Sequence, residues 1–140
     1  MRRAPTVVFH SLDDARAALA AARETGAPLT LTTAPGAAAY AGVQYLKAIV
    51  DRALAEHPDV SVTAVIDCGD DAGTAQGALR IGWKALRFSG PTETRRRIAD
   101  IAGQCGARLV GGEPDEAALD LLDLADPKAA CRAFFAGRTD

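Results

Sequence analysis

Side chains that could carry out chemistry stand at the ends of short apolar runs in this 140-residue chain. They are His10, Thr33, Asp67, Cys68 and Ser89, with a Gly111–Gly112 pair after a further run. A carboxylate can act as a general acid or base, and an ionised thiol as a nucleophile or metal ligand. If the runs are parallel strands, their carboxyl ends share the edge where α/β proteins bind ligands. We therefore predict Asp67 as catalytic and the other positions as ligand-binding.

Each of these positions also has an ordinary structural interpretation, which the sequence leaves open. Asp67 and the acidic residues just after it could cap the helix that is expected next. His10 suits the start of a helix, and a free cysteine such as Cys68 is usually a small buried hydrophobe. Ser89 precedes Gly90-Pro91 and suits a turn. The run Arg95-Arg96-Arg97, near a helix start, is typical of a solvated face.

Apolar runs rich in β-formers alternate with helical patterns along the whole chain. The expected strands are Thr6–His10, Leu29–Thr33, Val60–Cys68, Lys84–Phe88 and Arg108–Val110. The expected helices are Asp13–Thr25, Ala38–His57, Ala72–Ile81, Thr92–Gln104, Pro114–Leu124 and Asp126–Phe135. Ser11 suits the N-cap and Gly26 the end of the first helix. Strands that alternate with helices predict parallel pairing and right-handed crossovers.

The predicted fold is a single α/β domain over residues 1–140, with a five-stranded parallel sheet. Strands buried on both faces are continuous apolar runs, as in Val7-Val8-Phe9 and in the run 60–68. Leucine alternates with threonine over 29–33, and the run 108–110 is short, so both are predicted at edges. These assignments favour the flavodoxin-like order 2-1-3-4-5.

The composition excludes several classes of protein. The formal net charge is −2, with basic residues scattered, so neither nucleic acid nor an anionic membrane surface is an expected partner. No stretch approaches the ~20 apolar residues of a membrane helix. The three cysteines are widely spaced, which predicts reduced thiols in the cytoplasm. The alanine-rich bias is typical of a bacterial genome with high GC content.

Four stretches carry a resemblance to a known family. Pro35-Gly36-Ala37-Ala38-Ala39-Tyr40-Ala41-Gly42 is similar to "EGAAKYAG", and Val62–Gly69 is similar to "VALHLDHG", in class II fructose-bisphosphate and tagatose-bisphosphate aldolases. Val8–Leu31 resembles the first strand, helix and second strand of these enzymes, and Ala125–Ala130 resembles "TDPEEA". The resemblance implies a (β/α) barrel ancestry, in which this chain matches the first five β/α units.

The same resemblance implies that most of the family's zinc site is lost. Asp67 matches the family's catalytic acid/base, but Cys68 replaces the zinc-binding histidine beside it, and Val65 replaces an earlier histidine. Ala34 stands in place of a serine, and the later zinc ligands belong to strands beyond the fifth. Catalytic zinc typically has three protein ligands. We therefore expect no cofactor, with zinc disfavoured.

Two main functions follow from these expectations. The first is a degenerate aldolase relative that binds a carbonyl or phosphorylated small molecule at the strand ends. The second is an aldehyde lyase completed by oligomerisation or by a partner chain. A third possibility is a structural partner for a polypeptide that carries the missing strands. An open sheet of five strands leaves apolar residues to cover, so a homodimer is expected.

Overall fold

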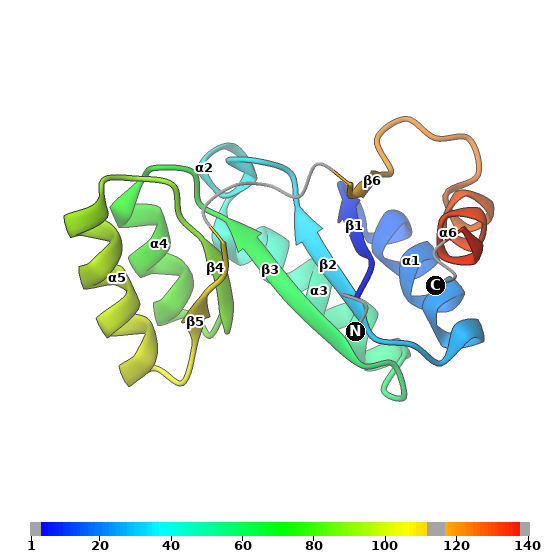
Figure 1. The fold of residues 1–140 in the computed structure, drawn as a ribbon, viewed down its shortest axis with the longest axis horizontal. Coiled ribbons are helices and arrows are strands. Elements are labelled where there is room, and N and C mark those ends of the chain that lie inside the picture. Colours follow the sequence, from blue (N-terminus) through cyan, green and yellow to red (C-terminus); the bar gives the residue numbers. More distant parts are fainter. Residues whose placement is uncertain (1–3, 112–116, 138–140) are drawn as a thin grey trace. The chain divides into compact units, whose positions relative to one another are not determined.

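A computed structural model describes residues 4–111 and 117–137, and their fold is α/β with parallel strands (Figure 1). The strands are β1 (Thr6–Phe9), β2 (Leu29–Thr33), β3 (Val62–Asp67), β4 (Ala85–Arg87), β5 (Arg108–Leu109) and β6 (Leu119–Asp120). The helices are α1 (Leu12–Thr25), α2 (Ala37–Ala41), α3 (Val43–Glu56), α4 (Ala72–Arg80), α5 (Thr92–Gln104) and α6 (Pro127–Ala136).

The strands hydrogen-bond in the order β5-β4-β3-β2-β1-β6, and the pairs β1–β6, β3–β4 and β4–β5 are parallel. From β1 to β5 each strand lies beside its neighbour in sequence, as in a (β/α) barrel, although this sheet is not closed. The α/β class and the partial barrel ancestry are therefore confirmed. The flavodoxin-like order 2-1-3-4-5 was wrong, because β2 lies between β3 and β1.

The error over β2 arose from its threonines. Leucine–threonine alternation indicated an edge strand with one polar face. In the structure Thr32 and Thr33 are 3% and 1% exposed. The Thr33 hydroxyl accepts a hydrogen bond from a neighbouring strand end, at 2.9 Å from the Asp67 nitrogen. A threonine whose hydroxyl is hydrogen-bonded is compatible with a strand buried on both faces.

Two predicted helices differ from the structure. The helix expected over 38–57 is interrupted at Gly42, whose φ of 92° an L side chain rarely adopts, and this separates α2 from α3. The prediction of a helix over 114–124 is wrong for the described residues of this range, because Leu119–Asp120 form the short strand β6. The beginning of that expected helix, 114–116, lies outside the described residues. The other helices follow the predicted boundaries closely, with Ser11 and Gly26 as the caps of α1.

Contacts group the chain into two compact units. Unit 1 comprises Met1–Thr32, Ile49–Thr63 and Asp115–Asp140, and unit 2 comprises Thr33–Ala48 and Ala64–Pro114. The prediction of a single domain over 1–140 stays a prediction.

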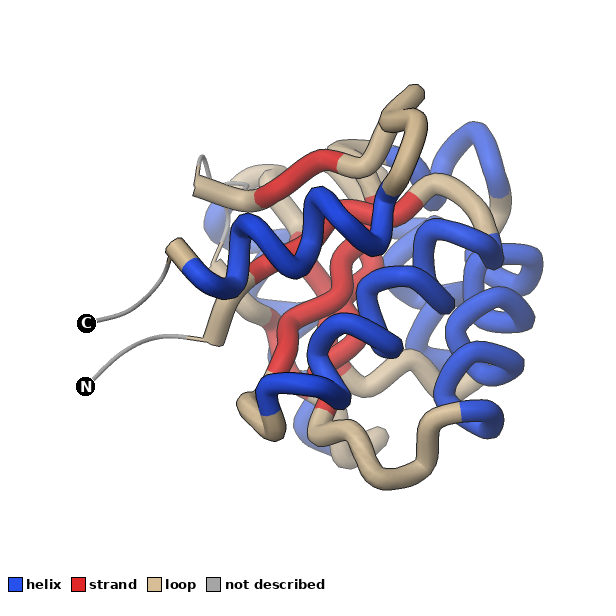
Figure 2. Tube along the Cα trace, turned by 90° about the vertical axis from the view of Figure 1, so that its right-hand side faces the viewer, coloured by secondary structure: helices blue, strands red, loops and turns tan. Residues whose placement is uncertain are grey.

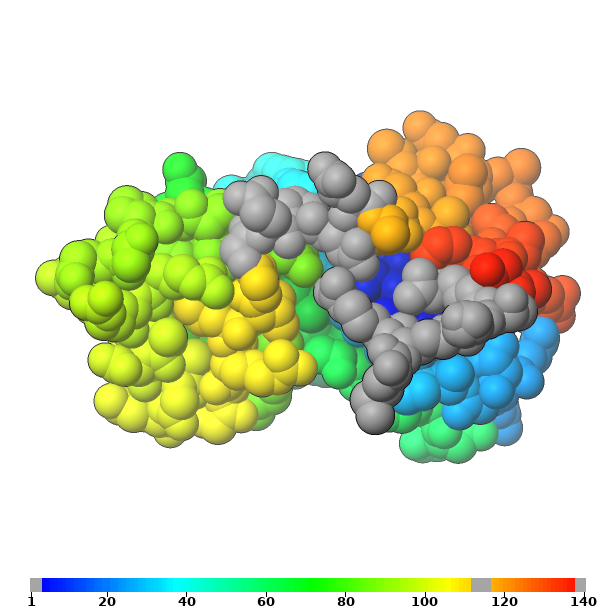
Figure 3. Space-filling model, in the orientation of Figure 1, coloured from blue at the N-terminus to red at the C-terminus, as the bar shows by residue number. Residues whose placement is uncertain are grey.

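In unit 1, β1 and α1 pack against β6 and α6 (Figures 1 and 2). The β1–β6 register pairs Val7 with Leu119 and Val8 with Asp120, and the Leu121 N–H donates to the Val8 carbonyl at 3.0 Å. Leu121 is 1% exposed, whereas its neighbour Leu122 is 54% exposed. Part of this segment is visible at the surface, in orange, in Figure 3. The segment 119–136 therefore covers the side of β1 that does not pair with β2.

Ion pairs on the surface of unit 1 join segments far apart in sequence. The Arg132 guanidinium donates to both oxygens of Glu24 at 2.9 and 2.7 Å, which links α6 to α1. Arg16 makes a similar two-bond contact with Glu56 at 2.8 Å for each bond. These pairs lower the pKa of Glu24, and bring that of Glu56 to about 2, chiefly through the arginine hydrogen bonds. Because they are exposed, they contribute specificity of packing more than stability.

In unit 2, α4 and α5 pack together and α5 contacts β5. The core contains the strand residues Val65, Ile66 and Leu86, and Phe88 just after β4, each at most 1% exposed. Trp83, 2% exposed, donates its indole N–H to the Val43 carbonyl at 3.1 Å. Its role is thus packing, which also fixes the start of α3. The helices are amphipathic, so their alanine-rich faces pack inwards.

Gly90 follows β4 where only a hydrogen side chain fits. A Cβ there would overlap Cζ of Phe88, whose ring is fully buried. We expect Gly90→Ala to lower the free energy of unfolding by about 1–3 kcal/mol, because the ring must move within a packed core. Gly103→Ala in α5 is the matched control: nothing lies within 4 Å, so it should stabilise by about 0.5–1 kcal/mol. Urea denaturation of both variants measures the two changes in the free energy of unfolding. Equal changes would refute the close contact between Gly90 and the Phe88 ring.

Among the described residues, no helix combines the length and the apolar character that crossing a membrane requires.

Candidate functional site

Asp67 ends β3 and is 4% exposed. Its Oδ1 accepts hydrogen bonds from the backbone N–H groups of Gly36 and Gly69, at 2.9 Å each. Both glycines have a positive φ, 69° and 58°, a backbone conformation that other residues rarely adopt. In this conformation each N–H group reaches the carboxylate of Asp67. One carboxylate oxygen therefore ties the loop after β2 to the loop after β3.

The second oxygen of Asp67 faces Arg87, the last residue of β4. Arg87 Nη1 lies 3.6 Å from Oδ2, and the two side chains are 9% and 6% exposed. The register of β3 and β4 sets this contact, since it pairs Asp67 directly with Arg87. A buried carboxylate needs a compensating charge, and this guanidinium supplies it. Both oxygens of Asp67 are thus engaged by groups of its own chain.

Backbone hydrogen bonds around Asp67 hold the adjacent strand ends together. The Asp67 N–H donates to Thr33 Oγ1 at 2.9 Å, and the Cys68 N–H donates to the Arg87 carbonyl at 2.9 Å. The Ser89 N–H donates to the Gly69 carbonyl at 2.7 Å. The carboxyl ends of β2, β3 and β4 therefore bring together Thr33, Asp67, Cys68 and Ser89 at one edge of unit 2, which we call the Asp67 edge.

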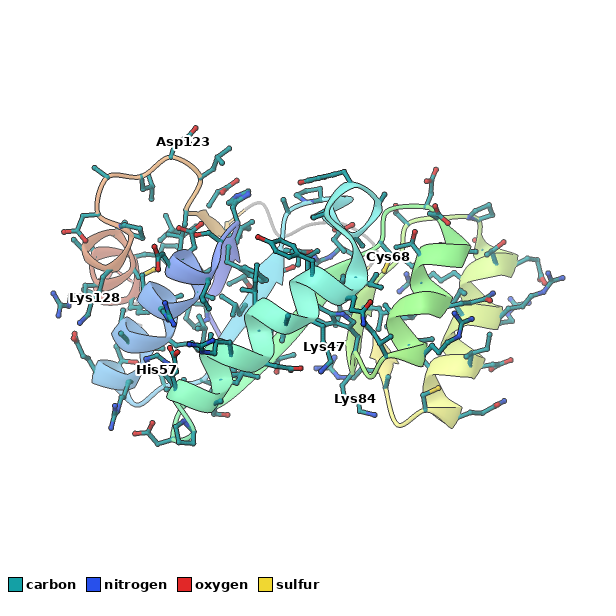
Figure 4. All side chains as sticks on the ribbon, turned by 180° about the vertical axis from the view of Figure 1, so that it is seen from behind. Lys47, His57, Cys68, Lys84, Asp123 and Lys128 are labelled. Carbon is teal, nitrogen blue, oxygen red and sulfur yellow. The ribbon has the colours of Figure 1, made fainter. Side chains whose placement is uncertain are left out.

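Cys68 is 1% exposed, at the start of the loop between β3 and α4 (Figure 4). Burial, together with smaller contributions from the nearby carboxylates of Asp67 and Asp71, raises the pKa of its thiol to about 12. Near neutral pH the side chain is therefore a thiol. A thiol is a poor nucleophile and a poor metal ligand, since both roles need the thiolate.

Thiol labelling should separate the three cysteines. Cys105 is exposed, while burial raises the pKa of Cys131 to about 11, with a further contribution from Asp14. At pH 7.5 we expect a disulfide reagent to modify Cys105 rapidly, and Cys68 and Cys131 only after denaturation. Mass spectrometry of the labelled peptides identifies the sites. Rapid native labelling of Cys68 would show that its loop opens or that the thiol ionises.

The remaining predicted residues of this edge are more exposed. Ser89 and Gly111 lie at the surface, and Gly112 lies outside the described residues. Arg95, from the first turns of α5, donates to the carbonyls of Phe88 and Val110 at 2.5 and 2.9 Å. It therefore caps the ends of β4 and β5, whereas the run of three arginines was interpreted as a solvated face. Its guanidinium adds a second positive charge, besides Arg87, beyond β4.

His10 follows β1 and belongs to unit 1. Its ring Nε2 lies 2.6 Å from Oδ1 of Asp120, and its N–H donates to Asp14 Oδ2 at 2.9 Å. The ring and the backbone of His10 are thus both engaged by carboxylates of unit 1.

Sequence reasoning missed Arg87, Arg95 and Asp120 as partners of the predicted residues. A signal for Arg87 was present, because it is the one charged residue in the apolar run Ala85–Phe88. The capping alternative for the acidic residues applies to Asp71, whose side chain accepts the Thr74 N–H at 3.2 Å. Asp67 instead has the loop and arginine contacts described above.

The family model described as class-II fructose-bisphosphate aldolase matches residues 3–94, well over half of the chain. The chain belongs to this family. Among its relatives, "Fructose-bisphosphate aldolase, plasmid" of Cupriavidus necator is 26% identical over 121 residues, covering 76% of this chain and 35% of the relative. The fructose-bisphosphate aldolases of Xanthobacter flavus and Pseudomonas aeruginosa are each 27% identical over 86 residues, covering 61% of this chain and 24% of the relative.

The chain thus spans about a third or less of the length of the curated relatives it matches. The resemblance drawn from the sequence is confirmed, and the match includes the segment from β1 to the start of α5. Asp67, Cys68 and Arg87 all lie within it.

The residues at the Asp67 edge do not fit the zinc that the resemblance implies. At the family's histidine position stands the buried thiol of Cys68, which burial keeps protonated. Asp67 already receives two N–H groups and a guanidinium. Among residues 4–111 and 117–137, no group of three or more histidine, cysteine or acidic side chains could hold a metal ion.

Proposed function

We propose that this chain is a catalytically degenerate member of the class-II aldolase family. Its Asp67 edge binds a phosphorylated small molecule and does not cleave it. The observation that carries the proposal is the full engagement of Asp67, because a general acid or base must be free to reach the reacting group. In this structure that carboxylate holds two loops and one strand end together.

The charges at this edge support a phosphorylated ligand over an uncharged one. Arg95 places a guanidinium at the ends of β4 and β5, and guanidinium groups suit phosphate recognition. The exposed Ser89, two residues after β4, adds a hydroxyl at the same edge. The carbonyl part of the ligand is proposed only from the substrate named for the relatives.

Cleavage of fructose 1,6-bisphosphate and tagatose 1,6-bisphosphate tests the proposal, with added zinc and with the Xanthobacter flavus aldolase as positive control. We expect no turnover above the blank, while calorimetry with dihydroxyacetone phosphate shows saturable binding. Dihydroxyacetone without phosphate should bind at least about tenfold more weakly at this edge. Zinc-dependent turnover would overturn the degenerate part of the proposal. Equal or absent binding of the two compounds would overturn the ligand part.

The second candidate is an aldehyde lyase completed by a second copy or by a partner chain. Retention of Asp67 favours it. It requires Arg87 to release Asp67 on assembly. Light scattering decides whether a homodimer forms, and the cleavage assay repeated above the dimerisation concentration decides whether assembly restores activity.

A further inference from the structure

Pairing of β6 with β1 brings an aspartate to the ring of His10. The two strands are parallel and Val8 is opposite Asp120, so the ends of both strands lie at the same edge of unit 1. The distance between His10 Nε2 and Asp120 Oδ1 is 2.6 Å, within hydrogen-bond range. The side chains are 22% and 53% exposed, so solvent reaches this pair.

Both members of the pair are fixed by further hydrogen bonds. The Leu122 N–H donates to the same Oδ1 of Asp120 at 2.9 Å. The His10 N–H donates to Asp14 Oδ2, and the Asp14 N–H donates to the hydroxyl of Ser11 at 3.1 Å. The helix cap of α1 therefore fixes the backbone of His10, while the turn after β6 fixes the carboxylate.

The charge of Asp120 decides which ring nitrogen of His10 carries the proton. Its partial burial raises the pKa, but the Leu122 N–H and the His10 ring outweigh this, so the pKa lies below the usual value. At neutral pH the carboxylate can only accept, and Nε2 of His10 must donate. The neutral ring therefore has its lone pair on Nδ1. No described residue donates a hydrogen bond to that nitrogen.

The surroundings of His10 are negative. Asp14 contacts its backbone and Asp120 its ring, and neither carboxylate forms an ion pair with a lysine or arginine of the described segments. A phosphate or carboxylate at this place would lie close to two carboxylates with no lysine or arginine partner among the described residues. An uncharged compound with hydroxyl groups has no such repulsion and can donate to Nδ1.

We propose that the His10–Asp120 pair forms a second small-molecule site, which takes an uncharged, hydroxyl-bearing compound through an O–H group that donates to Nδ1 of His10. The site is independent of the function proposed for Asp67. It lies at the carboxyl ends of β1 and β6, the side of parallel strands on which α/β proteins bind ligands.

Nitrogen-15 NMR of the histidine rings tests this directly, because the chain has only two histidines. His57 is an internal control: its Nδ1 lies 2.9 Å from the Ala53 carbonyl, so that nitrogen carries its proton. We expect opposite tautomers near pH 8, Nε2–H for His10 and Nδ1–H for His57. If His10 is found as Nδ1–H, the proposal fails.

Titration with glycerol and glycerol 3-phosphate tests the ligand class. We expect glycerol to shift the Nδ1 resonance of His10 in a saturable way and to leave His57 unchanged, with the phosphate at least about tenfold weaker. Asp120→Ala removes the acceptor and should abolish the tautomer preference and the shift, whereas Asp123→Asn, at the exposed tip of the next loop (Figure 4), should change neither. No saturable shift, or equal binding of the phosphate, would overturn the proposal without affecting that for Asp67.

Discussion

Replacing Arg87 by methionine should lower the free energy of unfolding by about 3–5 kcal/mol, as expected when one partner of a buried ion pair is removed. Both side chains are less than a tenth exposed, at 9% and 6%, so water cannot take over the role of the guanidinium. Methionine has a similar length and adds no charge, so the change removes the compensation for Asp67 without shortening the side chain. Denaturation in urea at pH 7 measures the effect.

The matched control is the double variant Asp67→Asn/Arg87→Met. An asparagine side chain keeps one oxygen to accept the Gly36 and Gly69 N–H groups, but it carries no charge that needs a partner. The double variant should therefore recover most of the stability that Arg87→Met loses, because replacing both charges is often nearly neutral. A single variant as stable as the original chain, or a double variant no better than the single one, would show that the pair has no structural role.

Leu121→Ala should destabilise the chain by about 2–5 kcal/mol, the usual cost of removing a buried leucine side chain. Leu121 is 1% exposed, and its N–H continues the β1–β6 ladder to the Val8 carbonyl. The truncation therefore weakens the cover of β1 by the segment 119–136. Chemical denaturation gives the total loss, and amide exchange at Val8 and Phe9 reports whether the edge of β1 opens first.

The neighbouring leucine provides the control for this experiment. Leu122 is 54% exposed, so Leu122→Ala should stay within about 0.5 kcal/mol of the original stability. If both alanine variants cost the same, β6 does not pack against β1 as described.

The sequence predicted the α/β class, most of the helix boundaries and the convergence of Thr33, Asp67, Cys68 and Ser89. The class and the helix boundaries depend on local signals, hydrophobic periodicity and helix caps, whereas the convergence follows from the rule that parallel strands end at one edge of the sheet. The neighbour of each strand is not local, and the polarity of the threonines in β2 was a misleading guide to it. Two-residue strands such as β6 are too short for periodicity to distinguish from a helix.

The contacts that define the chemistry of the Asp67 edge could not be predicted from composition or spacing. Asp67 alone is compatible with a catalytic acid/base, a helix cap or a buried ion pair. Which of these roles Asp67 has depends on Arg87, twenty residues later in the sequence, and on a strand register that pairs the two residues directly. Asp120 was placed in a helix, so its contact with His10 could not be anticipated.

Zinc content of the purified chain tests the central claim most directly: Asp67 and Cys68 are structural residues here rather than parts of a catalytic metal centre. The protein and a Cys68→Ser variant are equilibrated with zinc and dialysed. Inductively coupled plasma mass spectrometry then measures the number of zinc ions bound per chain. We predict only substoichiometric zinc, equal in the two proteins, because the thiol is buried with a pKa of about 12. Zinc bound at one ion per chain and lost in Cys68→Ser would contradict the account.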